Sequence, residues 1–339
     1  MMSYYQRILQ LSVVEKLCWH FKPHGLYVFN YHRIGDENDT AFDPHLFSCT
    51  QEHFKEQLEF YKNNFEVINI ETLNSLIHSN KKINKRLALI TFDDGYLDNY
   101  LHAYPLLKAA NLPACFFIAT DFIDQQKVPW WDEIAWLLKN NELHQEFIKK
   151  WQLPNGFQTL DSREQIYLLL KKVKSDTKTT MEEKLIQIRM DLNIDERQVM
   201  PKEQLFMDWD MVREVSANGI TIGSHTCSHR ILSHLEEQEQ TFEILQSKQK
   251  LETQLNGQPV RSFAYPVGGE TSYNKSSTKC LEEFEYQMAF TFLPGINTRL
   301  NKNRFTLKRF AISDNCNVET LKSSLCLHFI KETLSASTE

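Results

Sequence analysis

The 339-residue chain has no paired-cysteine motif and no apolar run long enough to span a membrane. Its seven cysteines stand singly, and their odd number suits reduced thiols better than a disulfide framework. The first 21 residues contain no uninterrupted apolar stretch, because Gln10, Ser12, Glu15 and Lys16 break it, which argues against a signal peptide. These absences predict a cytoplasmic protein without a transmembrane segment.

The chain also lacks an excess of positive charge. A net charge of -6 at pH 7 gives no reason to expect nucleic acid as a partner. Near the N-terminus, one side of a helix could be lined by Ile8, Leu9, Leu11, Val14 and Leu17. We expect this helix to pack on the domain, and peripheral contact with the inner face of the membrane is the alternative. Nothing in the sequence indicates the oligomeric state.

Strands and helices alternate along most of the chain, which favours a parallel α/β sheet or barrel. The expected strands are residues 26–32, 65–70, 87–92, 114–119, 220–223, 262–265, 286–291 and 306–312. The expected helices are 51–63, 71–78, 99–110, 209–218, 237–255 and one from 319. We therefore predict an N-terminal helix (1–24), a barrel domain (25–318) with a helical insertion (about 130–204), and a C-terminal helix and tail (319–339).

The motif TFDDGY at residues 91–96 closes the apolar strand 87–92. Two adjacent carboxylates at the end of such a strand are costly to hold unless something charged uses them. Neighbouring side chains on an extended chain point to opposite sides, so one of Asp93 and Asp94 can bind a metal while the other faces substrate or water. Helix capping would account for one acid, but not for two.

The motif SHTCSH at residues 224–229 supplies two histidines, His225 and His229, spaced i, i+4, which share one face in a helical turn. Asp plus two His is a three-ligand site of the zinc type, with an open position for water. Zn²⁺ suits these ligands best, and Co²⁺, Ni²⁺, Mn²⁺ and Fe²⁺ tolerate similar ones. Cys227 should point away from the shared face, and we interpret it as a packing residue.

Together with FAYPVGG at residues 263–269, these motifs resemble the first three motifs of the polysaccharide deacetylases, carbohydrate esterase family 4. The resemblance covers roughly residues 25–125 and 207–315. It implies a distorted (β/α)7-8 barrel and metal-dependent removal of N- or O-acetyl groups from sugars. The strand end at Tyr31-His32 resembles the circularly permuted branch typified by poly-N-acetylglucosamine deacetylases, in which the acid histidine precedes the Asp pair.

The resemblance implies that Asp94, His225 and His229 bind the metal and that Asp93 is the general base. His32 is the implied general acid. A second histidine, His328, lies in an expected amphipathic helix, and we interpret it as a packing or surface residue.

Further assignments follow from the same resemblance. The N–H of Val267 would stabilise the oxyanion. The third motif often carries an Arg near the base; Ala264 stands at that position here, so Arg309 would supply the charge instead. Substrate contacts are expected from Tyr265 and Pro266. Trp130 and Trp131 are interpreted first as packing of the insertion and second as a sugar-stacking surface, with Asp132 and Glu133 as solvated or capping residues. The carboxylate that orients His32 is hypothesised to be Asp314.

The predicted function is removal of N-acetyl groups from amino sugars of a surface glycan or its precursor, which could be lipid-linked. Two alternatives stay open. The same site would serve a sugar O-acetyl esterase or a deformylase, since water, metal and base are common to all three. A non-catalytic carbohydrate-binding barrel is the other alternative.

Overall fold

A computed structural model describes residues 19, 22–79, 81–175, 179–194, 200–201 and 203–336, with side chains up to Ile330. The chain divides into two compact units. The first takes in the chain up to Gly35, residues 47–125 and the chain from Phe206 onward, and the second takes in Asp36–Leu46 and Gln126–Leu205. The helix expected over residues 1–24 lies almost wholly outside the described residues.

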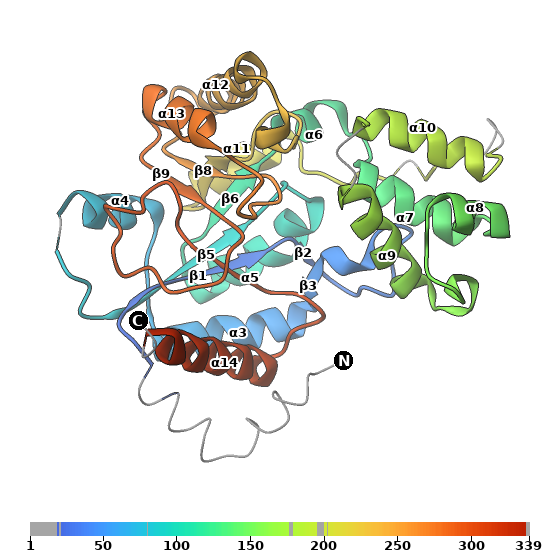
Figure 1. The fold of residues 1–339 in the computed structure, drawn as a ribbon. Helices are drawn as coiled ribbons and strands as arrows, with labels where there is room; N and C mark the ends of the chain where they lie inside the picture. Colours follow the sequence, from blue (N-terminus) through green and yellow to red (C-terminus); the bar gives the residue numbers. More distant parts are fainter. Residues whose placement is uncertain are drawn as a thin grey trace. The chain divides into compact units, whose positions relative to one another are not determined.

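The first unit is built on a parallel sheet (Figure 1). Its strands follow the order β10-β1-β5-β6-β7-β8-β9, with β4 beside β5. Their bounds are β1 (Gly25–Tyr31), β4 (Glu66–Val67), β5 (Arg86–Phe92), β6 (Cys115–Ile118), β7 (Thr221–Ser224), β8 (Ser262–Ala264), β9 (Met288–Phe290) and β10 (Phe310–Ala311). A separate pair, β2 (Arg33–Ile34) and β3 (Phe47–Cys49), follows β1.

Helices surround the sheet, and the sheet curls. The helices are α3 (Gln51–Asn64), α4 (Ile70–Ser79), α5 (Tyr104–Ala110), α6 (Thr120–Gln125), α11 (Trp209–Ala217), α12 (Glu237–Gln254), α13 (Lys275–Glu283) and α14 (Val318–Ala336). One isolated parallel bridge, between Phe290 and Leu307, links β9 to the segment that leads into β10. The predicted distorted (β/α) barrel is confirmed.

Three elements are shorter or less regular than the pattern predicts. Within residues 306–312 only Phe310 and Ala311 form ladder pairs, both with β1. The strand expected over 65–70 is limited to β4, which pairs with the start of β5. The helix expected over 99–110 begins with a π-helical turn, η2 (Asn99–Ala103), and π-helical turns often lie at functional sites.

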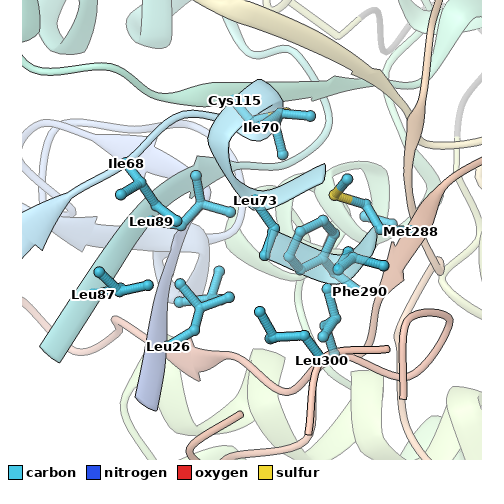
Figure 2. Close-up of a cluster of buried hydrophobic side chains, with 14 of the residues drawn as sticks. Leu26, Ile68, Ile70, Leu73, Leu87, Leu89, Cys115, Met288, Phe290 and Leu300 are labelled. Atoms are coloured by element: carbon cyan, nitrogen blue, oxygen red, sulfur yellow. The ribbon is translucent and has the colours of Figure 1, made fainter. Parts of the chain in front are cut away.

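The apolar core of the first unit is a cluster of buried side chains from the strands and from α4 (Figure 2). Alternate residues of neighbouring strands face it, and α4 contributes Ile70 and Leu73. The inward strand residues include Leu26, Val28, Leu87, Leu89, Cys115, Phe117, Met288 and Phe290. Since strand side chains alternate between two faces, the residues farther along each strand at the same parity also point inward.

The second unit is helical, with α7 (Trp130–Asn140), α8 (Gln145–Lys150), α9 (Ser162–Ser175) and α10 (Met181–Asp191) (Figure 1). Within it, the backbone N–H of Asp43 donates to Asp132 Oδ1 at 3.0 Å, and Arg189 pairs with Glu133 at 2.7 Å. Both acids are therefore structural. Among the described residues, no helix has the length and apolarity that crossing a membrane requires.

Candidate active site

The inward faces of β1 and β5 change from apolar to polar as the strands end. Leu26 and Val28 are followed at the same parity by Asn30, and Leu87 and Leu89 by Thr91. The two polar residues are register partners, and both are fully buried. In a β/α barrel the chemistry gathers at these carboxyl-terminal strand ends.

Three of the predicted residues, Asp94, His225 and His229, bring their ligand atoms within 4.8 Å of one another. Oδ1 of Asp94 lies 3.4 Å from Nε2 of His225 and 3.3 Å from Nε2 of His229. The carboxylate is only 2% exposed, and Oδ1 has no hydrogen-bond donor in the part of the chain that the structure describes. The structure therefore brings together the three residues predicted as metal ligands.

The donor set fits a divalent cation. Nδ1 of His225 lies 2.8 Å from the backbone oxygen of Ala264, and we assign the ring proton to this nitrogen, since a carbonyl can only accept. Nε2 of the neutral ring then points a lone pair at the Asp94 carboxylate. Two such groups repel unless a cation lies between them, and a histidine held through its second nitrogen is the usual arrangement at metal sites.

The pKa shifts of His229 and Asp94 suit the same ion. Burial lowers the pKa of His229 to about 4, so this imidazole is neutral at pH 7. Burial also acts to raise the pKa of Asp94, but the charge that His229 carries when it is protonated in acid and the contact with His225 outweigh it, so the pKa lies well below the usual range. For His225, burial acts to lower the pKa, and the negative charges of Asp93 and Asp94 raise it overall.

Asp93 is held by Arg309 in a buried bidentate ion pair. Nη1 and Nη2 of the arginine each lie 2.8 Å from one carboxylate oxygen, and the two side chains are 1% and 2% exposed. The amide of Asn30 donates to Asp93 Oδ2 at 3.2 Å, and its oxygen accepts from Arg309 Nη1 at 2.7 Å. Burial acts to raise the pKa of Asp93, but the charge of Arg309 outweighs it and lowers the pKa.

The two histidines are brought together by a loop, not by the helical turn considered from their spacing. Residues 225–231 form no helix, and both Thr226 (φ 67°) and His229 (φ 58°) have left-handed backbone conformations. Asp94 does as well (φ 75°). Non-glycine residues with positive φ cost free energy and cluster at functional sites.

His32 follows β1 directly and is only partly buried. Its carbonyl accepts from Nδ2 of Asn99 at 2.6 Å, and its ring lies 5.8 Å from that of Phe292, edge to face. After burial and the nearer charges, the charge of His32 also acts to lower the pKa of Asp93 and Asp94.

The two other residues considered alongside His32 are placed differently. Asp314 is exposed and accepts from the hydroxyl of Ser313 at 3.2 Å. The described contacts of His32 include none with this carboxylate, so the hypothesis that Asp314 orients the ring gains no support. In α14, the ring of His328 packs edge-on against Phe310 at 5.2 Å, in line with a packing role.

The third motif forms a turn after β8. Val267 is 42% exposed with φ 63°, and its backbone N–H has no hydrogen-bond acceptor within the described residues. Pro266 is buried. Tyr265 is 1% exposed, stacks on Tyr273 at 4.2 Å and donates its hydroxyl to the Phe305 carbonyl at 3.0 Å. These contacts give the side chain of Tyr265 a packing role, and they do not support the predicted contact with substrate.

Trp130 and Trp131 belong to the second unit, at the start of α7. Their rings meet edge to face at 5.3 Å, and Trp131 is 5% exposed. These contacts are those of a packed helix. The sulfur of Cys227, in the first unit, contacts the Glu243 carbonyl at 3.6 Å, and burial raises the pKa of this thiol to about 12. Such a thiol is inert, as a packing role requires.

A family model described as polysaccharide deacetylase matches residues 80–289, more than half of the chain. The chain belongs to the polysaccharide deacetylase family. Among curated relatives, YxkH of Bacillus subtilis (strain 168), whose name assigns it to the polysaccharide deacetylases, is 24% identical over 292 residues, covering 86% of this chain and 73% of that protein. The poly-β-1,6-N-acetyl-D-glucosamine N-deacetylase of Escherichia coli (strain K12) is 24% identical over 135 residues, covering 38% of this chain and 18% of that protein.

Solved structures of deacetylases share the fold. PplD of Streptococcus pyogenes, in complex with acetate, has a TM-score of 0.59 and 19% identity, covering 90% of this chain and 99% of that one. IcaB from Ammonifex degensii has a TM-score of 0.56 and 16% identity, covering 90% and 97% of the two chains. These likenesses support the curled barrel.

Three polar residues of this chain were not predicted as part of the site. Asn30 lies between Asp93 and Arg309, Asn99 holds the backbone of His32, and Glu243 holds the loop between the two histidines. The polar end of an otherwise apolar strand was a signal for Asn30. Nothing in the local sequence distinguishes Glu243 from the other acids of α12.

Proposed function

We propose that this chain is a metal-dependent hydrolase that removes N-acetyl groups from amino sugars of a glycan or its precursor. The observation that carries the proposal is the Asp94–His225–His229 cluster next to a second buried carboxylate, Asp93. A cation held by the first three residues and a base beside it are the two parts that hydrolysis of an amide by water needs.

In this proposal, Asp94 and the two histidines hold the ion, which would supply the positive charge that lowers the pKa of water and polarises the acetyl carbonyl. Asp93 accepts the proton that the attacking water loses. Because Arg309 keeps the pKa of Asp93 low, the carboxylate is ionised and ready to accept at neutral pH.

The remaining steps are assigned to two strand-end residues. As the water oxygen bonds to the acetyl carbon, the N–H of Val267 donates to the carbonyl oxygen, where negative charge develops. His32 gives a proton to the nitrogen as the C–N bond breaks. The products are acetate and a free amino sugar. Two protons are released, one from Asp93 and one from the new carboxylic acid; one restores His32 and the other passes to solvent.

For the substrate, we propose an oligomer of N-acetylglucosamine. The E. coli relatives are named as poly-β-1,6-N-acetyl-D-glucosamine N-deacetylases, which supports this choice as the first probe. Phe292 is 36% exposed beside His32 and offers an aromatic face of the kind on which pyranose rings pack. It also lines a cavity of about 570 Å³ that continues along β10 and α14.

The test is acetate release from β-1,6-linked N-acetylglucosamine oligomers. It compares the Zn²⁺-loaded protein, chelated protein and the Asp93→Asn variant. Metal-dependent release that the variant loses would support the deacetylase and the base together. Parallel N-formyl and O-acetyl sugars separate the deformylase and esterase alternatives.

Sugar binding without turnover of any of the three acyl groups would contradict hydrolysis and favour the non-catalytic barrel. The cytoplasmic location expected from the sequence, with peripheral membrane contact as the alternative, stays a prediction. Fractionation of expressing cells tests it.

A further inference from the structure

The loop between the two proposed metal ligands has a strained backbone with little internal hydrogen bonding. It contains two left-handed residues, Thr226 and His229, and internally the structure gives it the bond from His229 N–H to Thr226 Oγ1, at 3.0 Å. A strained conformation of this kind persists only where the surroundings fix it.

One side of the loop is fixed by a buried carboxylate on α12. Oε2 of Glu243 accepts the backbone N–H groups of Cys227 and Ser228, each at 2.9 Å, and Oε1 accepts the hydroxyl of Ser228. Glu243 is 4% exposed. Burying a carboxylate is costly unless it is well hydrogen-bonded, and these three donors satisfy it.

The opposite side is held by the start of α6. The backbone N–H groups of Thr120 and Asp121 donate to the carbonyls of Thr226 and Cys227, at 3.2 and 2.9 Å. One turn beyond Glu243, Ser247 shares a hydrogen bond of 2.7 Å with Ser224 of β7, so α12 lies along this strand. The loop is thus fixed between two helices.

We propose that Glu243 is a positioning residue, which sets the separation of His225 and His229 and so tunes the affinity for the metal ion. The inference rests on the proposed function, because it needs the metal site. No Lys or Arg in the described part of the chain forms an ion pair with Glu243, and its carboxylate accepts hydrogen bonds from the loop.

Two conservative substitutions separate position from charge. Glu243→Gln keeps the length of the side chain, and its carbonyl oxygen can still accept from the two backbone N–H groups, although the charge is lost. Glu243→Asp keeps the charge but withdraws the oxygens by one methylene. Positioning predicts that the Asp variant is impaired and that the Gln variant is close to the wild type.

The measurement is the dissociation constant of Zn²⁺, determined by competition with a chromogenic chelator at fixed pH. Removing an outer partner of metal ligands typically weakens metal binding about 10–100-fold, which is the loss expected for Glu243→Asp. Ser277→Ala is the matched control: it breaks a buried hydrogen bond of 2.7 Å between α13 and Gln240 of the same helix, away from the loop, and its Zn²⁺ affinity should stay near that of the wild type.

Weaker Zn²⁺ binding in Glu243→Gln together with wild-type binding in Glu243→Asp would contradict the positioning role and indicate a purely electrostatic one. An equal loss of Zn²⁺ affinity in Ser277→Ala would mean that Glu243 acts only through the general packing of α12. Amide exchange of residues 225–229 gives a readout without metal, and it should be faster in Glu243→Asp than in Glu243→Gln. Failure of the wild type itself to bind Zn²⁺ would instead count against the metal site of the proposed function.

Discussion

Arg309 and Asp93 are 216 positions apart in the sequence, and they form a buried, bidentate ion pair at 2.8 Å. The arginine comes from the segment that enters β10, and the acid from the end of β5. Nε of Arg309 also donates to the Thr291 carbonyl at 2.8 Å, so the guanidinium joins the end of β9 to the proposed base. The residue that links the barrel segments therefore also sets the charge of the site.

Replacing Arg309 should shift the pH dependence of the reaction. In the wild type, Arg309 lowers the pKa of Asp93, so the base is ionised down to pH values below the usual aspartate range. Arg309→Lys loses the bidentate contact, and Arg309→Gln loses both this contact and the positive charge. The pKa of Asp93 should therefore rise in both variants. The acidic limb of kcat/KM against pH should move to higher pH, more for Gln than for Lys.

The control for this shift is Arg304→Gln, which removes a surface ion pair with Glu282 and should leave the limb in place. Breaking a buried pair costs about 3–5 kcal/mol of stability, so the profiles are recorded at low temperature with folding checked by circular dichroism. An unchanged limb in folded Arg309→Gln would exclude a tuning role.

Substituting the proposed metal ligand Asp94 should separate stability from metal binding. Zn²⁺ at 100 times its dissociation constant should stabilise the wild type by about 2.7 kcal/mol, whereas Asp94→Asn should gain almost nothing. Without metal, Asp94→Asn should be less stable than the wild type at neutral pH, because a carboxyl group whose pKa is depressed in the folded state stabilises that state when it is ionised. Asn tolerates the left-handed conformation of this position, so the loss reflects the charge and not the backbone.

Thermal unfolding with Zn²⁺ and with chelator measures both effects. His328→Gln, in the α14 histidine that packs on Phe310, should keep the full metal response. A metal response retained by Asp94→Asn would show that the ion binds elsewhere.

The exposed ring of Phe292 should contribute to substrate binding more than to the chemical step. A packing contact worth about 1 kcal/mol raises KM roughly fivefold when it is lost. We expect this change in Phe292→Ala for oligosaccharides, with a smaller fall in kcat. Phe242→Ala removes a ring that is 60% exposed on α12 and serves as the control. A fall in kcat at constant KM would instead mean that Phe292 acts through His32.

The sequence was sufficient for the parts of the site that strand ends specify locally. An Asp pair after an apolar strand and two histidines after another predict residues that meet in any parallel barrel, because the carboxyl ends of its strands share one rim. The alternation of side chains along a strand also applies to Tyr265. Ala264 faces the core, so by alternation the next residue points outward, toward Tyr273.

The rest of the site depends on contacts that the local sequence does not encode. Glu243 is one acid among several on α12, and only the packing of that helix against β7 turns it toward the loop. Asn30 has a strand position that is easily found, but its partners Arg309 and Asp93 come from two other segments. Such residues are defined by the three-dimensional arrangement, and their types alone are too common to mark a site.

A glycine at the approach to the metal ligands should also prove sensitive. At Gly223, a Cβ atom would lie 2.4 Å from the ring of Phe117 and 2.7 Å from Ser262 Oγ, both from neighbouring strands. Overpacking of this kind costs about 1–3 kcal/mol. Because His225 follows at the same parity of the strand, Gly223→Ala should weaken Zn²⁺ binding as well as lower the unfolding temperature. Gly269→Ala, where nothing lies within 4 Å, should change neither. The measurements are denaturant unfolding and Zn²⁺ titration. Equal stability and equal Zn²⁺ affinity in the two variants would contradict this packing argument.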